Sequence, residues 1–314
     1  MSFAIWRSHF GISRETTYGS SGALGTRYIP VLSYNPGWED ELERIVDKGM
    51  RGAGSMDYAM YTGVSKSRAG YEHYFYPDNC GVFLYGIFGN DVVSGATAPF
   101  THTFGLSTAQ PPSYTLFDYA GLVGNSSETK ITGAQLERVE LQYSRANGAL
   151  VVRPSWVGYA STGFAETTDA YTTEAPFRGW QAVMSIAGTT NTRLLDFNLS
   201  LSRSVDLIYA GNNTQNPNNR EVGPLEVTGT LSAYASTSLE WDRYQANSTG
   251  ALSVVMTDST NSITFTITDF RLEKTTLDRG GNYARWNASF RGLHSATDSG
   301  PASISLVVQS SCQF

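Results

Sequence analysis

Alternation of apolar and polar residues with a period of two runs through most of this sequence. A half-buried β-strand requires that period, because successive side chains point to opposite faces of a sheet. Turn-forming clusters, such as Arg279-Gly280-Gly281-Asn282, separate the alternating segments. The segments that we predict as strands are Tyr71–Tyr76, Tyr114–Tyr119, Gln135–Tyr143, Ala149–Tyr159, Thr192–Leu201, Leu225–Ala233, Ala251–Met256, Ser262–Glu273, Tyr283–Leu293 and Ala302–Gln309. The sequence therefore predicts an all-β fold.

Helical signals are few and short. The segment Asp78–Phe88 places its large apolar residues on one face and precedes Gly89, a residue type that commonly ends helices. A capping box at Thr237-Ser238-Leu239-Glu240 opens a second short helix, Ser238–Ala246, with Trp241 and Tyr244 on one side. Trp38–Lys48 fits either a third helix or an ordered loop. The expected fold is β-rich with a few short helices.

The charge balance limits the partners that this chain can hold. It has 22 basic and 28 acidic residues, which give a net charge of −6 at pH 7. A protein that binds duplex DNA tightly needs a cluster of Lys and Arg to release counterions from the phosphates. No basic run is present. The composition therefore argues against a duplex-DNA-binding protein.

Neither a membrane segment nor a disulfide framework is expected. No stretch of about 18 apolar residues occurs, as a transmembrane helix would need. Arg7 and His9 interrupt the apolar patch near the N-terminus, which favours synthesis in a cytoplasm over secretion by a signal peptide. Cys80 and Cys312 lie far apart, reduced thiols are the default, and the sequence leaves open whether the two ever pair.

A weak internal repeat relates the two halves of the chain. Ile131–Ser161 aligns without a gap with Phe265–Ser295, each residue shifted by 134 positions, and both segments have the pattern strand, turn, strand. A strand, a short helix and another strand precede each of them. We therefore expect a duplication that gives two tandem β-domains. The first, residues 1–165, includes an N-terminal arm and a long loop, and the second, residues 166–314, includes a C-terminal arm.

The sequence resembles the major tail tube proteins of long-tailed, siphovirus-like bacteriophages. The resemblance begins with Gly11–Gly19 and Arg27–Asn35, and continues through Tyr74-Phe75-Tyr76-Pro77 on to Gly89. His102-Thr103-Phe104 and Pro112–Leu116 are similar to the central pattern of that family. The segment between Asn35 and Gly70 is longer than a minimal tube domain needs, and the resemblance gives it no role.

The resemblance implies a structural protein of the virion tail and not an enzyme. In that family each tube domain is a small β-sandwich or β-barrel with one flanking helix, and six domains form a ring. A duplicated chain would therefore form that ring from three subunits, with a hexamer of whole chains as the alternative. Stacked rings would form a conduit through which DNA passes into the host without specific binding. The implied partners are further copies of the chain and other tail proteins, namely the tape measure, the terminator and the distal tail protein.

Residues with catalytic or metal-binding chemistry show no recognisable arrangement. The four histidines, His9, His73, His102 and His294, lack metal-ligand spacing, and neither cysteine has a CxxC partner. We therefore predict no catalytic, cofactor-binding or metal-binding residue and no cofactor.

Two other classes of function remain open, a tail-associated carbohydrate-degrading enzyme and a carbohydrate-binding adhesion module. A glycosidase needs only two carboxylates. The candidates on or near strands are Asp57, Glu72, Asp118, Asp196, Asp206, Glu226 and Asp242. Trp38, Trp156, Trp180 and Trp286 could form a sugar-binding surface, although such aromatics more often lie in cores or subunit interfaces. The charged run Glu39–Arg44 fits a solvated face or a polar contact between stacked rings.

Overall fold

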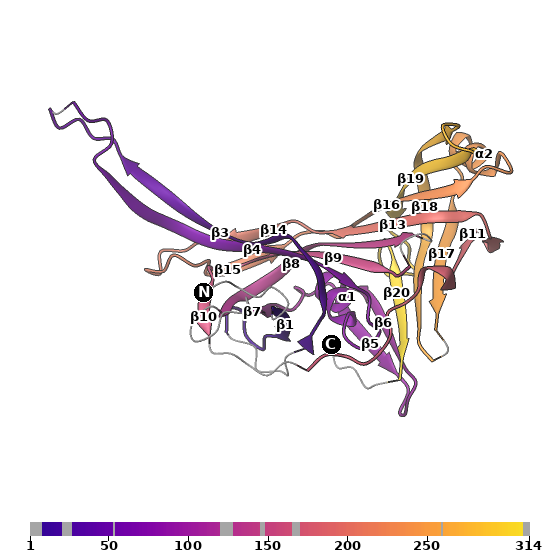
Figure 1. Cartoon of the computed structure of the whole chain (residues 1–314), viewed down its shortest axis with the longest axis horizontal. Helices are drawn as coiled ribbons and strands as arrows, with labels where there is room; N and C mark the ends of the chain where they lie inside the picture. The colour runs from indigo at the N-terminus through magenta and orange to yellow at the C-terminus, as the bar shows by residue number, and fades with distance from the viewer. Residues whose placement is uncertain are drawn as a thin grey trace.

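A computed structural model describes residues 8–20, 27–52, 54–119, 128–144, 148–164, 170–258 and 260–309 of the chain. Antiparallel strands make up most of it, and the described part contains two short α-helices (Figure 1). The prediction of an all-β fold is confirmed. Cys312 and part of the expected domain junction, residues 165–169, lie outside the described residues.

The first set of elements ends with β10. Its members are β1 (His9–Arg14), β2 (Arg27–Tyr28), β3 (Val31–Asp47), β4 (Ala59–Tyr74), α1 (Gly81–Phe88), β5 (Gly89–Ser94), β6 (Phe100–Leu106), β7 (Tyr114–Tyr119), β8 (Glu128–Ser144), β9 (Val151–Gly158) and β10 (Thr162–Phe164).

A 3₁₀ turn, Gly179–Gln181, opens the second set. Its strands and helix are β11 (Ala182–Ile186), β12 (Thr189–Asn191), β13 (Leu194–Ser202), β14 (Val205–Ile208), β15 (Asn219–Val222), β16 (Glu226–Tyr234), α2 (Leu239–Gln245), β17 (Gly250–Thr257), β18 (Ser262–Asp278), β19 (Arg285–Leu293) and β20 (Ser303–Val308).

One continuous antiparallel sheet, which we call the long sheet, crosses both sets. Its strand order is β3–β4–β9–β8–β13–β16–β19–β18. A second layer lies behind each half, where β7 joins β1 to the first part of β8, and β17 joins β11 to the first part of β18. The core fills the space between the layers and contains Trp156, Phe83, Leu199 and Phe290, all fully buried.

The two sets repeat the same pairings with the same irregularities. The β7–β8 ladder has a bulge between Tyr114 and Leu116. The β17–β18 ladder has one between Gly250 and Leu252, each residue 136 positions later. β1 with β2 and β11 with β12 lie in corresponding places, as do β10 and β20. The additions are the β5–β6 hairpin in the first set and the β14–β15 hairpin in the second.

The gapless alignment of the two hairpins, with one shift of 134, is wrong for their first strands. Trp156 lies opposite Leu136 in β8, and Phe290 lies opposite Leu272 in β18. The shift is therefore 134 from β9 to β19 but 136 from β8 to β18. A β-bulge follows directly after Leu136 and after Leu272. The second hairpin is thus two residues shorter at its turn, a difference that a count of identities does not reveal.

The two helices differ in what they bury. Phe83, Leu84 and Ile87 of α1 are fully buried, as predicted, and Gly89 ends the helix with φ 82°. In α2, however, the buried residue is Glu240, whereas Trp241 is 37 % exposed and Tyr244 is half-buried, so the expectation that the side with Trp241 and Tyr244 faces the core is wrong.

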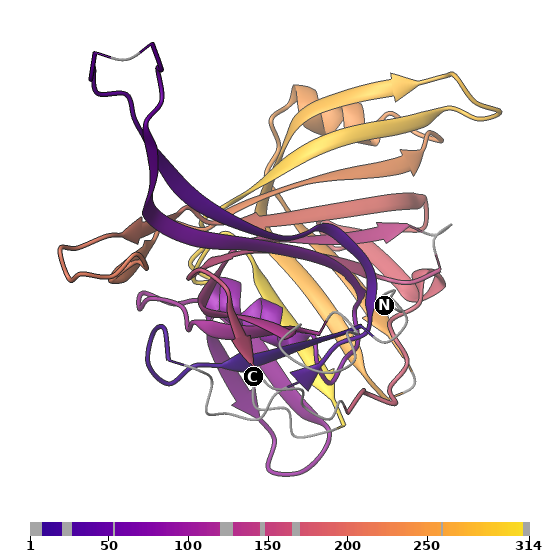
Figure 2. The same ribbon diagram turned by 60° about the vertical axis from the view of Figure 1, so that its left-hand side comes forward.

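The segment Trp38–Lys48 is neither a helix nor a loop. Residues 38–47 belong to β3, which pairs with β4, and the far part of this pair forms a two-stranded arm that projects far from the body (Figures 1 and 2). Cross-strand ion pairs, such as Glu41 with Lys66 at 2.9 Å, favour the extended pairing over a helix.

Candidate assembly surfaces

Three of the four histidines are buried, which indicates that they pack in the interior of the protein. His73 and His102 are fully buried, and His9 is 7 % exposed. His73 packs against Phe83, and burial lowers its pKa to about 4. His102 contacts Asp91 at 2.9 Å. No group of three or more potential metal ligands occurs in the described part of the chain.

The seven candidate carboxylates are spread over different elements. The strand register places none of them opposite another of the seven. Glu72 and Glu226 form ion pairs with arginines, and Asp242 accepts a hydrogen bond from Ser238 at the start of α2. Burial raises the pKa of Asp118 to about 6, but none of the other six carboxylates lies opposite it in the sheet. The strand pairing therefore assembles no acid pair from these candidates.

The tryptophans do not form one surface either. Trp156 is fully buried against Tyr114, and Trp38 packs against the core. Trp180 is 69 % exposed, whereas Trp286 is mostly buried and stacks on Trp241.

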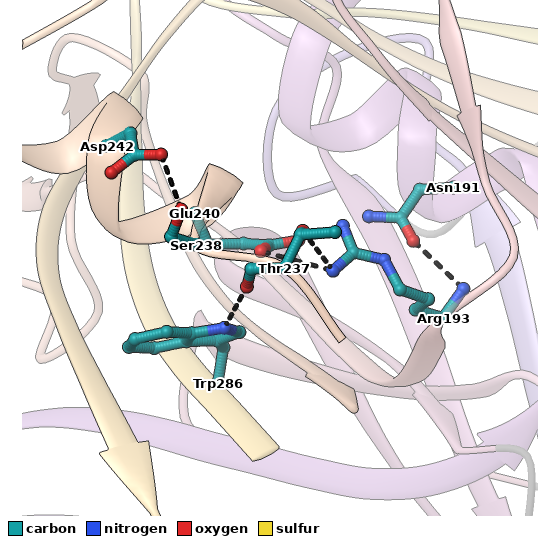
Figure 3. Close-up of polar contacts among 7 residues, drawn as sticks. All are labelled: Asn191, Arg193, Thr237, Ser238, Glu240, Asp242 and Trp286. Atoms are coloured by element: carbon teal, nitrogen blue, oxygen red, sulfur yellow. Dashed lines mark hydrogen bonds and ion pairs between the residues drawn. The ribbon is translucent and has the colours of Figure 1, made fainter. Parts of the chain in front are cut away.

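A buried ion pair attaches α2 to the loop before β13. Arg193 and Glu240 meet through Nη2 and Oε1 at 2.5 Å, and their side chains are 12 % and 3 % exposed. Arg193 Nη1 also donates to Thr237 Oγ1 at 2.9 Å, and the Thr237 carbonyl accepts from the indole N–H of Trp286 (Figure 3). This cluster holds a helix whose large side chains, Leu239 and Trp241, are only partly buried.

The long sheet has one face on the core and one open face. Polar side chains cover the open face because alternate residues of every strand point away from the core. They include Arg68, Glu72, Arg138, Glu140, Gln142, Arg153, Ser155, Asn198, Ser200, Ser202, Glu226, Thr228, Thr230, Lys274, Thr276, Asn287, Ser289 and Arg291. A hollow over β8, β13, β16, β19 and β18 is lined by Gln142, Asn198, Thr230, Ser289 and Lys274.

The two sets of strands join through β8 and β13. Seven consecutive residue pairs connect these strands, from Asp196 opposite Ser144 to Ser202 opposite Arg138. Leu141 and Leu199 face each other in the middle and are fully buried. We call this pairing the internal joint.

Two unpaired strand edges lie at opposite ends of the long sheet. Among the described residues, β3 pairs only with β4, and the part of β18 from Lys274 to Asp278 pairs only with β19. These edges correspond to the two edges that meet in the internal joint, because β3 precedes β4 as β13 precedes β16. Exposed strand edges invite pairing with another chain.

The arm, residues 42–64, exposes apolar side chains. Leu42, Ile45, Met60 and Tyr61 are 43–64 % exposed, and Met50 is fully exposed near the tip. Exposed apolar side chains give a hairpin in solvent no stabilisation, whereas they stabilise a hairpin that docks on another surface and buries them.

The family model for the phage tail tube protein matches residues 6–311. The chain belongs to that family. Among curated proteins, none matches the sequence. The family resemblance found in the sequence is confirmed, and with it the interpretation of this tail tube protein as a structural subunit of the tail. Members self-assemble into a tube together with other tail proteins. In the described part of the chain, no helix has the length and apolar character needed to cross a membrane.

The features that matter for assembly were not predicted from the sequence. The paired arginines on the open face and the two free edges depend on strand register, which no sequence motif indicates. The similar tripeptides Leu136-Glu137-Arg138 and Leu272-Glu273-Lys274, which follow the shift of 136, are a signal that could have shown it.

Proposed function

We propose that three chains of this tail tube protein form a closed ring in which residues 1–165 and 166–314 are two equivalent tube domains. The internal joint carries this proposal. It already joins the first set of strands to the second by an antiparallel pairing in one continuous sheet. Repeating the same joint between chains would give six domains in a ring with three-fold symmetry. Closure would also remove both free edges.

The internal joint also predicts the register between chains. Thr276 of β18 corresponds to Glu140 of β8 through the shift of 136. Glu39 of β3 corresponds to Ser200 of β13, because β3 pairs with β4 in the same register as β13 pairs with β16. Since Glu140 lies opposite Ser200, Thr276 should lie opposite Glu39 of the partner subunit. Lys274 then comes opposite Glu41 of the partner subunit, an opposite-charge pair across the joint.

Burial supports this register. Leu141 and Leu199 are fully buried in the internal joint. Their counterparts, Leu277 and Trp38, are only half-buried in the single chain. Pairing of β18 with β3 of the partner subunit would cover both side chains and complete the core at the joint.

The remaining contacts follow from the arm and the ends of the tube. We propose that the exposed apolar residues of the arm dock on the next ring, and that the charged run Glu39–Arg44 makes polar contacts at its base. The end rings would meet other tail proteins, for which the tape measure, terminator and distal tail proteins are the candidates. DNA would pass through the lumen without specific binding, and the chain would be made in the host cytoplasm before assembly into the virion tail.

A disulfide between the proposed partners tests the ring. Residues opposite each other in antiparallel strands have Cα atoms about 4.5–5.5 Å apart, within the range of about 4.4–6.8 Å that a disulfide spans. Glu39→Cys with Thr276→Cys, in a Cys312→Ser background, should oxidise between chains of assembled tubes. On a non-reducing denaturing gel the product should grow to three chains and stop there.

Two further pairs act as controls. Glu140→Cys with Ser200→Cys occupies the equivalent positions in the internal joint and should oxidise within one chain. Glu41→Cys with Thr276→Cys shifts the proposed register by two residues, to a Cα separation of about 7–8 Å, and should not oxidise. Closure at six chains, an open-ended ladder, or no interchain product from tubes in which the internal pair oxidises would overturn the trimer.

A further inference from the structure

The arginines of the open face do not stand alone. Arg291 on β19 reaches Glu226 on β16 and Glu273 on β18, the strands on either side of it, the latter at 2.5 Å. Arg68 on β4 contacts Glu41 at 2.7 Å and Glu137 at 2.6 Å. Each of these guanidinium groups therefore faces two carboxylates.

Two further arginines of this face each contact one carboxylate. Arg153 meets Glu72 at 3.1 Å, and Arg138 meets Glu140 at 3.2 Å. Between the charged pairs lie rows of hydroxyl and amide side chains, such as Asn198 opposite Thr230 and Thr230 opposite Ser289. The open face is thus polar, and each of these four arginines has a carboxylate partner.

Closure of the long sheet into a ring decides which way this face points. The second layers and the core lie behind the opposite face, and α1 lies on that side (Figure 1). When the sheet closes, the bulky side requires the larger circumference and goes outward, so the thin open face turns inward.

We infer that the open face lines the lumen and that its carboxylates neutralise its arginines, so that DNA phosphates slide past without being bound. This inference rests on the ring proposed above. An unpaired guanidinium that meets a phosphate releases a counterion, and each such contact steepens the salt dependence of binding by about 0.9 in a log–log plot. A row of free arginines repeated in every ring would hold DNA along the whole tube. The charge of Lys274 is also neutralised, because the proposed joint places Glu41 of the partner subunit opposite it.

The arginines have a reason to be present despite that risk. Arg291 connects three neighbouring strands through its two carboxylates, and Arg68 connects β4 to β3 and β8. The pairs therefore hold neighbouring strands of the wall together and present no unpaired positive charge to DNA.

Labelling of a single cysteine tests where the face lies. Ser200→Cys, in a Cys312→Ser background, should react in assembled tubes with a small maleimide but not with a maleimide on a long polyethylene glycol chain. Asp242→Cys, on the exposed side of α2, should react with both. In unassembled protein both sites should react with both reagents. Equal reaction of Ser200→Cys with the bulky reagent in intact tubes would overturn the lumen assignment and leave the tube itself standing.

Binding of a short DNA duplex to unassembled protein, followed by fluorescence anisotropy, tests the neutralisation. Glu226→Gln with Glu273→Gln frees Arg291, and the variant should bind DNA more tightly, with a salt slope steeper by about 0.9. Adding Arg291→Gln should abolish the gain, and Asp242→Asn, which removes a carboxylate elsewhere, should produce none.

Glu72→Gln, which frees Arg153, gives a second test on a different strand. If neither set of substitutions changes DNA binding while both variants keep the parent circular dichroism spectrum, the neutralising role is wrong. A gain that persists after Arg291→Gln would also contradict it, because the freed guanidinium would not be its source.

Discussion

Removal of the Glu240 carboxylate should destabilise the chain strongly. Glu240 is 3 % exposed and Arg193 is 12 % exposed, so Glu240→Ala leaves a guanidinium out of water with its opposite charge gone. Breaking a buried ion pair from one side costs about 3–5 kcal/mol. A folded domain is stable by only about 5–15 kcal/mol, so this one change should remove a large part of the stability.

Replacement of both partners should cost far less. Arg193→Met with Glu240→Leu substitutes apolar groups for both charges and leaves no buried charge unpaired, and such exchanges are often close to neutral. The single variants Arg193→Met and Glu240→Leu together should therefore lose about 3 kcal/mol or more beyond the double variant. That difference is the coupling between the two groups.

Urea unfolding of unassembled protein measures these free energies. The stacked indoles of Trp241 and Trp286, next to the ion pair, make tryptophan fluorescence a suitable probe. The slopes of the unfolding transitions must agree among the variants for the comparison to hold. Single variants that lose less than about 1 kcal/mol, as exposed pairs do, would refute the buried-pair interpretation. A double variant as unstable as the sum of the singles would do the same.

Three other outcomes are expected. Leu84→Asp places a carboxylate at a fully buried position of α1 and should cost at least about 4 kcal/mol in urea unfolding, whereas Val92→Asp, at a 56 % exposed position, should cost under about 1 kcal/mol. Because burial raises the pKa of Asp118 to about 6, the folded chain holds this proton more tightly than the unfolded chain, and the stability that the residue contributes falls as pH rises from about 4 to about 6. Asp118→Asn should therefore gain stability relative to the parent over that interval in a pH series of unfolding curves, and a constant difference would contradict the buried carboxyl. Cys80 is fully buried and burial raises its pKa well above the usual range, so in a Cys312→Ser background a thiol reagent should modify it only after denaturation, and rapid modification of native protein would contradict its placement.

Strands with one face on the core were predictable from the sequence. Tyr114–Tyr119 coincides with β7, and most other predicted strands match an observed one within a few residues, because burial of one face enforces the alternation. The arm was not predictable in this way. Most of its side chains are exposed, and the charged run Glu39–Arg44 at its base carries no alternation that distinguishes a strand from a helix.

The surfaces that matter for assembly depend on register. The ion pair between Arg291 and Glu226 joins residues 65 positions apart, and only the pairing of β16 with β19 brings them together. The two-residue difference between the hairpins hides the better correspondence of β8 with β18 from a gapless comparison. Helix α2 shows the same limit, because the partner of Glu240 comes from a distant loop.

The internal joint has a consequence for how a tube grows. Free molecules that associate lose translational and rotational freedom worth about 4–15 kcal/mol for each partner captured. In the proposed ring, three of the six joints are formed when each chain folds, since the chain between β8 and β13 keeps their effective concentration high. A ring then needs three molecules to meet instead of six, so its formation depends on a lower power of the subunit concentration. Such a ring would nucleate at protein levels too low for single-domain subunits joined by contacts of the same strength.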